Sequence, residues 1–351
     1  MDLTQLREPI VQAPLAGGPS TPQLAAAVGD AGGLGFLAAG YKTAAALAQD
    51  IGELRALTDA PFGVNVFSPP GDRADSAALE RYAARLQPEA DRYGVQLGAP
   101  RHDDDDLQAK LDVVVAERVE VVSFTFGCPQ VDLVARLHEA GCDVWVTVTG
   151  PQEAIQARDV GADALVVQGL EAGGHRGYFV DGPQVEDLGL LAALRLIAHS
   201  VQLPLVAAGG IADGASVAAV MCAGAAAAQI GSALMLAPEA GTSPAHRAAL
   251  ASATPTRLTR AFSGRQARGI VNRFLQEHDE HAPAAYPDVH HITTPIRAAA
   301  RRAGDPQAVN LWAGQTHLLA REAPAGEIVR GIGAEARAAV AQLARRLDQA
   351  P

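Results

Sequence analysis

Residues 146–169 read VTVTGPQEAIQARDVGADALVVQG, and residues 206–231 read VAAGGIADGASVAAVMCAGAAAAQIG. Each stretch has the same layout: an apolar strand, a glycine-containing turn, a segment of helical length that ends in Gly-Ala, and a second apolar strand. A strand, a crossover helix and a second strand form a unit in which the two strands run parallel. Two similar units in one chain indicate consecutive modules of one fold rather than two unrelated domains.

The same rhythm extends along most of the chain. Short apolar runs rich in valine and isoleucine recur eight times, each followed by turn residues and an alanine-rich segment of helical length. Eight parallel strands joined by right-handed crossovers close naturally into a barrel. We therefore predict an α/β fold, a (β/α)8 TIM barrel that forms a single domain over residues 1–351, with strands at 9–14, 33–38, 62–67, 119–124, 143–148, 162–168, 203–209 and 225–231.

Two stretches interrupt this rhythm. Residues 69–112 include the run Asp103–Asp106, which we interpret as an acidic helix N-terminus, because carboxylates stabilise the positive end of the helix dipole. Residues 241–315 form a polar excursion with prolines and histidines, before a last helix at about 325–348. Long loops at the carboxyl ends of barrel strands usually cover the active site, so 241–315 is the predicted lid within the domain.

Composition and charge exclude several classes of function. The net charge of -11, without a cluster of lysine or arginine, disfavours nucleic acid and anionic membrane surfaces as partners. The sequence shows no secretory signal pattern and no long apolar stretch, so we expect a cytoplasmic protein. Cys128, Cys142 and Cys222 are too few and too scattered for a disulfide framework or a zinc site, and no metal site is predicted.

Glycines at two neighbouring strand ends indicate a phosphate site. Gly209-Gly210-Ile211 and Gly231-Ser232 follow the last two predicted strands, where barrels of this type bind phosphate through backbone N–H groups. Neither the dinucleotide pattern GxGxxG after the first strand nor the P-loop pattern GxxxxGK[ST] is present. The phosphate is therefore expected to belong to a mononucleotide or a sugar phosphate.

A histidine and three amides are the other candidate site residues. His175 lies in the glycine-rich loop after the sixth strand, where it could act as a base or bind an anion. Asn65, Gln168 and Gln229 are polar residues within or at the end of apolar strands, and a buried amide without partners would cost free energy. Three amides that converge on one barrel mouth suit hydrogen bonding to a ring such as isoalloxazine and to a ribityl chain.

Several of these stretches closely resemble the nitronate monooxygenase family, formerly called 2-nitropropane dioxygenase, and its bacterial class I in particular. The resemblance covers nearly the whole chain. It is weaker at residues 286–292, where members of this class have tyrosines and a lysine in the substrate pocket and this chain reads YPDVHHI. The similar stretches include QAPLAGG, PFGVNVF, VVSFTFGCP, VQGLEAGGHRG, LPLVAAGGIADG, AAAAQIGSALML and YPDVHHITTPIRAAA.

The resemblance implies an FMN enzyme that oxidises alkyl nitronates, especially propionate 3-nitronate, with O₂ to carbonyl products and nitrite or nitrate. It implies His175 as the active-site histidine, which would take the α-proton of a neutral nitroalkane or position a preformed nitronate. By the same resemblance FMN is bound by Asn65, Gln168, Gly173, Gly210, Gln229, Ile230, Gly231 and Ser232.

Two other functions are compatible with these features. The first is an NAD(P)H-dependent FMN reductase on the same barrel, similar to enoyl-ACP reductases or quinone reductases, which share the glycine loops and a histidine. The second is a flavin-binding protein without catalytic activity, although His175 and the apparently open barrel mouth favour an enzyme.

Overall fold

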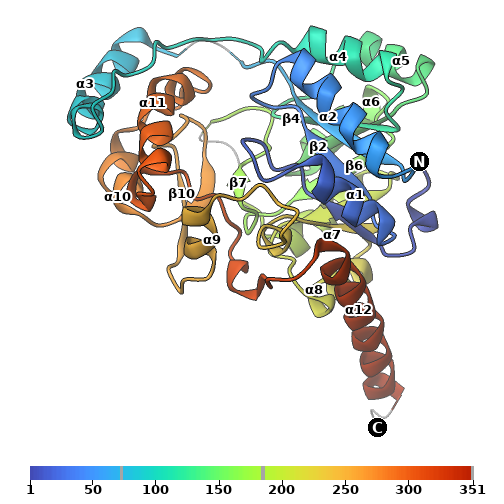
Figure 1. Ribbon diagram of the computed structural model, residues 1–351. Coiled ribbons are helices and arrows are strands. Elements are labelled where there is room, and N and C mark those ends of the chain that lie inside the picture. The colour runs from blue at the N-terminus through green and yellow to red at the C-terminus, as the bar shows by residue number, and fades with distance from the viewer. Residues whose placement is uncertain (72–73, 183–185, 349–351) are drawn as a thin grey trace.

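The computed structural model describes residues 1–71, 74–182 and 186–348, and its main sheet is a parallel barrel (Figure 1). Its eight strands are hydrogen-bonded in the order β1-β9-β8-β6-β5-β4-β3-β2. A parallel bridge between Val11 and Leu34 joins the first strand to the residue just before the second, which brings the two ends of the sheet together. The predicted (β/α)8 TIM barrel and all eight of its strands are confirmed. The strands are β1 (Ile10–Gln12), β2 (Gly35–Ala38), β3 (Phe62–Phe67), β4 (Val121–Thr125), β5 (Asp143–Val148), β6 (Ala164–Gln168), β8 (Leu205–Ala208) and β9 (Ala227–Ile230).

Helices cover the outside of the barrel. Helix α1 begins where the Thr21 side chain accepts the N–H of Leu24 and a proline follows, and α8 begins with a capping box between Asp213 and Ser216. Among the described residues, no helix combines the length and apolarity needed to cross a membrane. The barrel helices are α1 (Pro22–Asp30), α2 (Ala44–Leu57), α4 (Leu107–Ala116), α5 (Val131–Glu139), α6 (Pro151–Asp159), α7 (Leu190–Ser200), α8 (Gly214–Cys222) and α12 (Ala325–Asp348).

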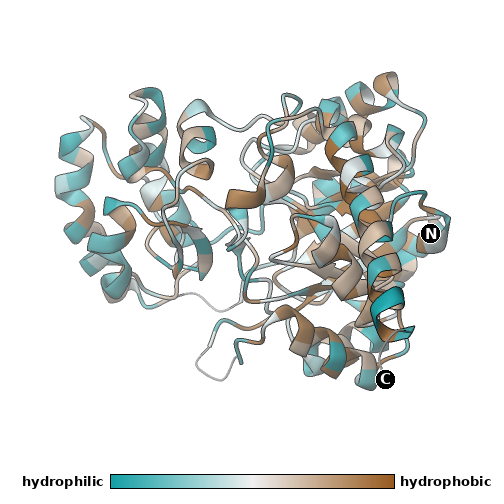
Figure 2. Cartoon of the chain, turned by 90° about the horizontal axis from the view of Figure 1, so that it is seen from below, coloured by the Kyte–Doolittle hydropathy of each residue, from teal (hydrophilic) through white to brown (hydrophobic). Residues whose placement is uncertain are grey.

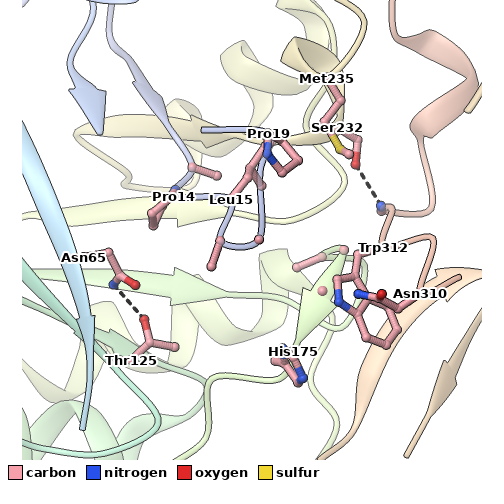
Figure 3. A pocket seen from close by; sticks show the side chains of 18 of the residues that line it. Pro14, Leu15, Pro19, Asn65, Thr125, His175, Ser232, Met235, Asn310 and Trp312 are labelled. Carbon is pink, nitrogen blue, oxygen red and sulfur yellow. Dashed lines mark hydrogen bonds between the residues drawn. The ribbon is translucent and has the colours of Figure 1, made fainter. Parts of the chain in front are cut away.

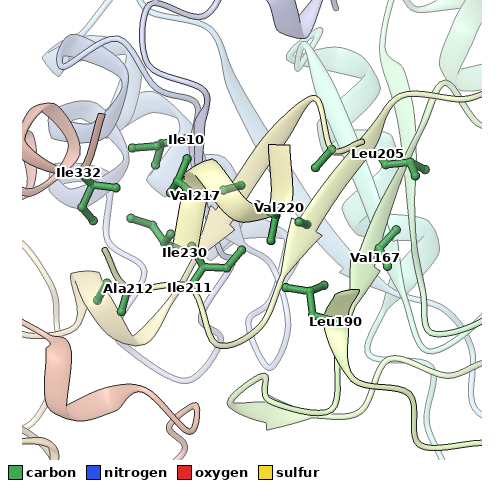
Figure 4. Packing of buried hydrophobic residues seen from close by; sticks show 14 of the residues in the cluster. Ile10, Val167, Leu190, Leu205, Ile211, Ala212, Val217, Val220, Ile230 and Ile332 are labelled. Carbon is green, nitrogen blue, oxygen red and sulfur yellow. The ribbon is translucent and has the colours of Figure 1, made fainter. Parts of the chain in front are cut away.

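The barrel has two apolar layers, one inside the strands and one between strands and helices. The inner layer is centred on Phe36 and Trp145, whose rings lie 5.7 Å apart, and it fills the inside of the barrel. In the outer layer, side chains such as Val167, Leu205 and Ile230 pack against the surrounding helices (Figure 4). Because both faces of each strand are buried, the strands read as nearly continuous apolar runs.

A second group of elements forms what we call the outer unit, residues 74–97 and 241–315. Its helices surround a hydrophobic core separate from that of the barrel, and Figures 1 and 2 show this unit to one side of the barrel. A three-stranded antiparallel sheet, β10-β11-β7, joins it to the loop after β6. The elements of the outer unit are α3 (Ser76–Arg92), α9 (Pro244–Leu250), β10 (Thr256–Thr259), β11 (Ala267–Ile270), α10 (Arg273–His278) and α11 (Asp288–Arg302), while β7 (Gly174–His175) lies in the loop after β6.

Short 3₁₀ helices connect several of these elements, at Leu3–Gln5, Ser232–Leu234, Asp279–His281, Pro306–Ala308 and His317–Leu319. The insertions that build the outer unit follow β3, β6 and β9, so they all leave the barrel at the carboxyl ends of its strands. That is the face at which barrels of this type place their active sites. Whether residues 241–315 act as a lid stays a prediction.

The acidic run Asp103–Asp106 precedes α4 as predicted, but its side chains do not cap the helix. Asp105 and Asp106 both have left-handed backbone conformations, with φ of +58° and +52°, whereas a capping residue is normally extended. The Asp105 carboxylate instead accepts the N–H of Tyr41 at 3.1 Å and pairs with Lys110 at 2.6 Å. The run therefore fixes the loop after β2 in place.

Candidate active site

A cavity of about 390 Å³ lies at the carboxyl ends of the barrel strands, between the barrel and the outer unit. Its volume is within the range of small-molecule and cofactor sites. Figure 3 shows the arrangement of its walls: Asn65 and Thr125 point into it from the barrel, and His175, Asn310 and Trp312 lie on another side. No aspartate or glutamate lines this cavity within the described ranges, so its fixed charges favour an anionic ligand.

The glycine loops supply backbone donors without side chains. Gly209 and Gly210 have φ of +120° and +68°, conformations that favour glycine, and both line the cavity. The N–H groups of Gly173 and Gly210 make no hydrogen bond to any other described residue. Such unpaired N–H groups at strand ends suit a phosphate.

Two of the predicted residues also hold the outer unit in place. A Cβ on Gly173 would come within 2.5 Å of the backbone of Ala313 and Gly314, so only glycine allows this close approach. The Ser232 hydroxyl accepts the N–H of Gly314 at 2.9 Å, the contact drawn in Figure 3. The loops predicted to bind phosphate are therefore also the loops on which residues 313–314 rest.

The hydrogen bonds of Asn65 orient its side-chain oxygen as an acceptor for a ligand in the cavity. Its Nδ2 atom donates to the backbone oxygen and the hydroxyl of Ser123, at 3.1 and 2.9 Å, and to the hydroxyl of Thr125, at 3.0 Å. These bonds fix the amide, and they leave Oδ1 without a partner in the described part of the chain. Since a flavin ring carries N–H and carbonyl groups at its edge, an oriented amide suits it.

Gln168 and Gln229 differ, although the sequence gives them the same signal. The Gln168 amide donates to the backbone oxygen of His175 at 2.9 Å and accepts from Arg176 and from the N–H of Gly177, so the protein uses both of its ends. Gln229 lines the cavity, and its amide has no hydrogen-bond partner among the described residues. Gln168 thus shapes the loop that carries His175, whereas Gln229 is available to a ligand.

The structure brings together all of the predicted site residues except one. Gly231 lines the cavity with Ser232, but the Ile230 side chain is fully buried in the layer between strands and helices (Figure 4). Ile230 alternates with Gln229 along β9, so the two side chains point to opposite faces of the strand. Any contact of Ile230 with a cofactor would have to use its backbone.

His175 lies between the barrel mouth and the outer unit. It ends the short strand β7, where it is paired with Ala267 of β11, and its ring is surrounded by Phe126, Tyr286 and Trp312 at centroid distances of 5.4 to 5.6 Å. Burial, with smaller effects of Arg265 and Arg297, lowers the pKa of His175 to about 3. The imidazole is therefore neutral near pH 7 and can accept a proton or a hydrogen bond.

Sequence reasoning missed a group of cavity residues that come from the outer unit, from the loop after β2 and from the end of β4. Tyr41 stacks on His290 with ring centroids 4.2 Å apart and planes 7° apart, and its hydroxyl lies 3.2 Å from that of Tyr286. Burial lowers the pKa of His246 to about 4 and that of His290 still further, so both rings are neutral. The missed lining residues include Tyr41, Thr125, His246, Ser263, His290, Thr294, Arg297, Asn310 and Trp312.

One signal in the sequence could have identified part of this group. His290, Thr294, Arg297 and Arg301 follow one another at helical spacing on α11 and all line the cavity, while the apolar residues between them enter the core of the outer unit. A polar stripe of this kind is usually taken as a solvated face. Here the second face of the helix is turned toward a ligand site.

Fold and cavity together define an α/β barrel with a cavity suited to anions at the carboxyl ends of its strands, the face at which enzymes of this fold place their active sites. Residues 2–335 match the nitronate monooxygenase family. The chain therefore belongs to the nitronate monooxygenase family, and it is an oxidoreductase that acts as a monooxygenase.

Individual relatives agree with this assignment. The chain is 40% identical to a nitronate monooxygenase from Paraburkholderia phytofirmans over 98% of this chain and 96% of that one. A crystal structure of a nitroalkane oxidase from Streptomyces ansochromogenes is 51% identical and superimposes with a TM-score of 0.94, covering 97% of this chain and 99% of that one. FabK from Thermotoga maritima is more distant, with 28% identity and a TM-score of 0.77 over 98% of this chain and 97% of that one.

Proposed function

We propose that this protein is an FMN-dependent nitronate monooxygenase that uses O₂ to oxidise alkyl nitronates to carbonyl products and nitrite or nitrate. Its family supports oxidation of nitronates as the activity. The observation that carries the finer proposal is the cavity itself. Glycine N–H groups without a partner in the described part of the chain, a fixed asparagine amide and a neutral histidine face one space, and no described carboxylate lines it. Both a cofactor phosphate and an anionic nitronate suit such a space.

The residues that would hold FMN come from the barrel. The N–H groups of Gly173 and Gly210 and the loop Gly231-Ser232 would receive the phosphate, and the amides of Asn65 and Gln229 would bind polar atoms of the ring and the ribityl chain. Gln168 would act through the protein, by holding the backbone of His175. When bound, a flavin supplies the redox chemistry, accepting electrons from the nitronate and passing them to O₂.

His175 would act on the substrate. In its neutral form it can take the α-proton of a nitroalkane, which converts the substrate to its nitronate. Burial disfavours the imidazolium, but a nitronate anion formed beside the ring opposes that effect, because an adjacent negative charge stabilises the protonated form. For a substrate that arrives as the nitronate, no proton need move and His175 only positions the anion. We propose propionate 3-nitronate as the preferred substrate of this kind.

The test has two parts. The cofactor released from the purified protein by heat is identified by chromatography, with FMN as the expected result. The protein is then mixed anaerobically with propionate 3-nitronate and, separately, with NADH and NADPH, while the flavin absorbance is followed. Rapid bleaching by the nitronate, with no faster bleaching by either nicotinamide, supports the proposal.

The alternative, an NAD(P)H-dependent FMN reductase, makes the opposite prediction. The likeness to FabK is the observation in its favour, at 28% identity. Rapid bleaching by NADH or NADPH, without reduction by any nitronate in a panel of chain lengths, would replace the monooxygenase proposal by this one. Reduction by neither class of compound would favour a flavin-binding protein without this catalysis.

A further inference from the structure

Arg297 is a buried cation that forms no ion pair with an aspartate or glutamate among the described residues. Its side chain is 8% exposed, and the charged and titratable groups that shift its pKa are Tyr41, Arg301 and Tyr286. Burial lowers its pKa to about 10, so the guanidinium still carries its charge near pH 7. A buried charge is costly unless something compensates it, and the protein supplies only neutral acceptors.

The hydrogen bonds of Arg297 leave one edge of the guanidinium available. Nε donates to the Thr293 hydroxyl at 3.0 Å, and Nη2 donates to the backbone oxygen of His290 and to the Thr294 hydroxyl, both at 2.8 Å. The contact of Nη1 is with Oδ1 of Asn310, at the long distance of 3.5 Å. Nη1 is therefore the nitrogen with donor capacity left for a ligand.

Asn310 adds a second donor beside it. Because its Oδ1 is turned toward Arg297, its Nδ2 is directed elsewhere, and that atom has no acceptor among the described residues. Arg297 and Asn310 both line the cavity, and Figure 3 shows Asn310 beside Trp312 on the wall near His175. Two adjacent donors, one of them charged, form the arrangement that binds a carboxylate through both of its oxygens.

This pair lies on a different wall from the proposed phosphate site. Gly173, Gly210 and Ser232 belong to barrel loops, whereas Arg297 is on α11 of the outer unit, next to the stacked rings of Tyr41 and His290. Arg297 is nonetheless close enough to His175 to lower its pKa. Besides Arg301, which also lines the cavity, the imidazole of His175 and the guanidinium of Arg297 are thus two separate points at which a substrate anion can be bound.

We propose that Arg297 and Asn310 form a subsite for a carboxylate at the far end of the nitronate substrate. The proposal rests on the proposed function and makes Arg297 a specificity-determining residue: the nitronate group faces His175, and the carboxylate accepts hydrogen bonds from Nη1 of Arg297 and Nδ2 of Asn310. Short nitronates with a terminal carboxylate are then preferred to simple alkyl nitronates of the same length.

The first experiment compares the nitronate of 3-nitropropionate with the nitronate of its amide, which has the same shape and lacks the terminal charge. We expect kcat/KM of the wild-type enzyme to favour the carboxylate by about tenfold to a hundredfold, the range for a charge-assisted hydrogen bond. Asn310→Asp places a carboxylate against the guanidinium without removing Arg297 or its other contacts. In this variant we expect the ratio to fall to about one or below, because the new charge competes with the substrate and repels it.

Further variants separate charge from folding. Arg297→Gln should abolish the preference, while Arg297→Lys should keep part of it, since lysine keeps the charge but not the planar fork. Arg302→Gln changes an exposed arginine on the same helix, outside the cavity, and should keep the wild-type ratio. FMN content is measured in every variant. Loss of FMN together with equal losses on both substrates would show that Arg297 pairs with the cofactor phosphate, and would overturn the proposal.

A binding measurement keeps the proposal independent of catalysis. Succinate has the shape and charge of propionate 3-nitronate, because a carboxylate replaces the planar nitronate group, and butyrate lacks the second charge. Calorimetry on the flavin-loaded protein should show tighter binding of succinate, with the difference lost in Asn310→Asp. Equal affinities in the wild type would overturn the subsite. If no nitronate is oxidised but succinate is still preferred, the proposed function fails and the anion subsite stands.

Discussion

The Nε2 atom of His175 lies 2.8 Å from the Oγ atom of Ser263. The Ser263 hydroxyl also lies 3.3 Å from the backbone oxygen of Arg265, to which it can only donate. When the hydroxyl donates to that oxygen it accepts from the imidazole, which places the proton of neutral His175 on Nε2 and leaves the lone pair on Nδ1. In that tautomer Nδ1 is the atom that can take a proton from a substrate, whereas in the other tautomer Nδ1 can donate to an anion.

The first prediction separates the two roles of His175. In His175→Asn, turnover of a neutral nitroalkane should be nearly abolished, because asparagine cannot accept the α-proton. Activity on the preformed nitronate should fall by only about tenfold to a hundredfold, the loss of one or two hydrogen bonds to an anion. The measurement is kcat/KM on both ionisation states of one substrate at matched FMN content. Equal losses on the two forms would show that His175 binds the anion and is not the base.

The second prediction concerns the partner of His175. Ser263→Ala removes the hydroxyl that holds Nε2 in place, so the imidazole loses its fixed orientation. We expect kcat/KM on a neutral nitroalkane to fall by about tenfold, with a smaller effect on the nitronate. Ser252→Ala is a matched control, since that hydroxyl is hydrogen-bonded but lies outside the cavity. Equal activity of Ser263→Ala and Ser252→Ala would contradict the role of Ser263.

The third prediction tests the phosphate loops. Gly210→Val introduces a Cβ that would lie 3.0 Å from Cβ of Glu171, at a φ of +68°, so residues 209–211 must move and their N–H groups with them. FMN content should collapse. Gly141→Val controls for backbone strain alone, because Gly141 has a φ of +84° and open space around it, outside the cavity. Full FMN occupancy in Gly210→Val would contradict the assignment of the phosphate site.

The fourth prediction is a pH dependence of stability in the cofactor-free protein. The pKa of His175 is about 3 in the folded state, against an ordinary value of 6.5, so between these pH values the unfolded chain binds a proton that the folded protein does not. The free energy of unfolding should therefore decrease as pH falls below about 6.5, by up to about 1.4 kcal/mol per pH unit from this group.

Other buried histidines contribute in the same direction, so the readout is a difference between proteins. Between pH 7.5 and pH 5, urea unfolding should show wild type losing about 2 kcal/mol more than His175→Gln. Parallel pH profiles of the two proteins would mean that His175 is not neutralised by burial.

The fifth prediction concerns the proposed lid, residues 241–315. If this segment closes over the cavity, a bound substrate analogue should slow its limited proteolysis, because closure orders exposed backbone. Arg257 in β10 is exposed and provides a cleavage site for trypsin within the segment. Arg345, near the end of α12, is also exposed and serves as the control site, because it is far along the chain from the cavity residues. We expect succinate to slow cleavage after Arg257 and leave cleavage after Arg345 unchanged. Equal rates with and without bound ligand would argue against a lid.

The barrel could be predicted from the sequence because each of its strands is buried on both faces. When eight apolar runs such as FGVNVF and DVWVTV alternate with helical segments, the pattern indicates a parallel barrel. The strands of the small sheet gave no such signal. β10 reads TRLT and β11 reads ARGI, and strands this short, with arginine and glycine in them, have neither an apolar run nor a clear alternation.

The candidate site was predictable only where it lies on the barrel. Asn65 and Gln229 lie in the second halves of β3 and β9, and His175 lies in the loop after β6, and the place of such positions in a closed barrel is known in advance. The contribution of Arg297 depends on how the outer unit docks, which is decided by contacts such as the stacking of Tyr41 on His290, between segments distant in the sequence. The different use of Gln168 and Gln229 depends on which backbone groups reach each amide, and sequence pattern carries no information on that.

The two walls of the cavity come from different parts of the fold, so the residues of one wall can change while those of the other stay the same. The proposed cofactor contacts belong to the barrel, while Arg297, Asn310 and Trp312 belong to a unit with its own hydrophobic core. If the proposed function holds, mutations in that unit can alter which nitro compound is accepted while the proposed cofactor contacts on the barrel are unchanged. Grafting residues 241–315 between homologues, with the matching α3, is accordingly a rational starting point for engineering new substrate ranges on this scaffold.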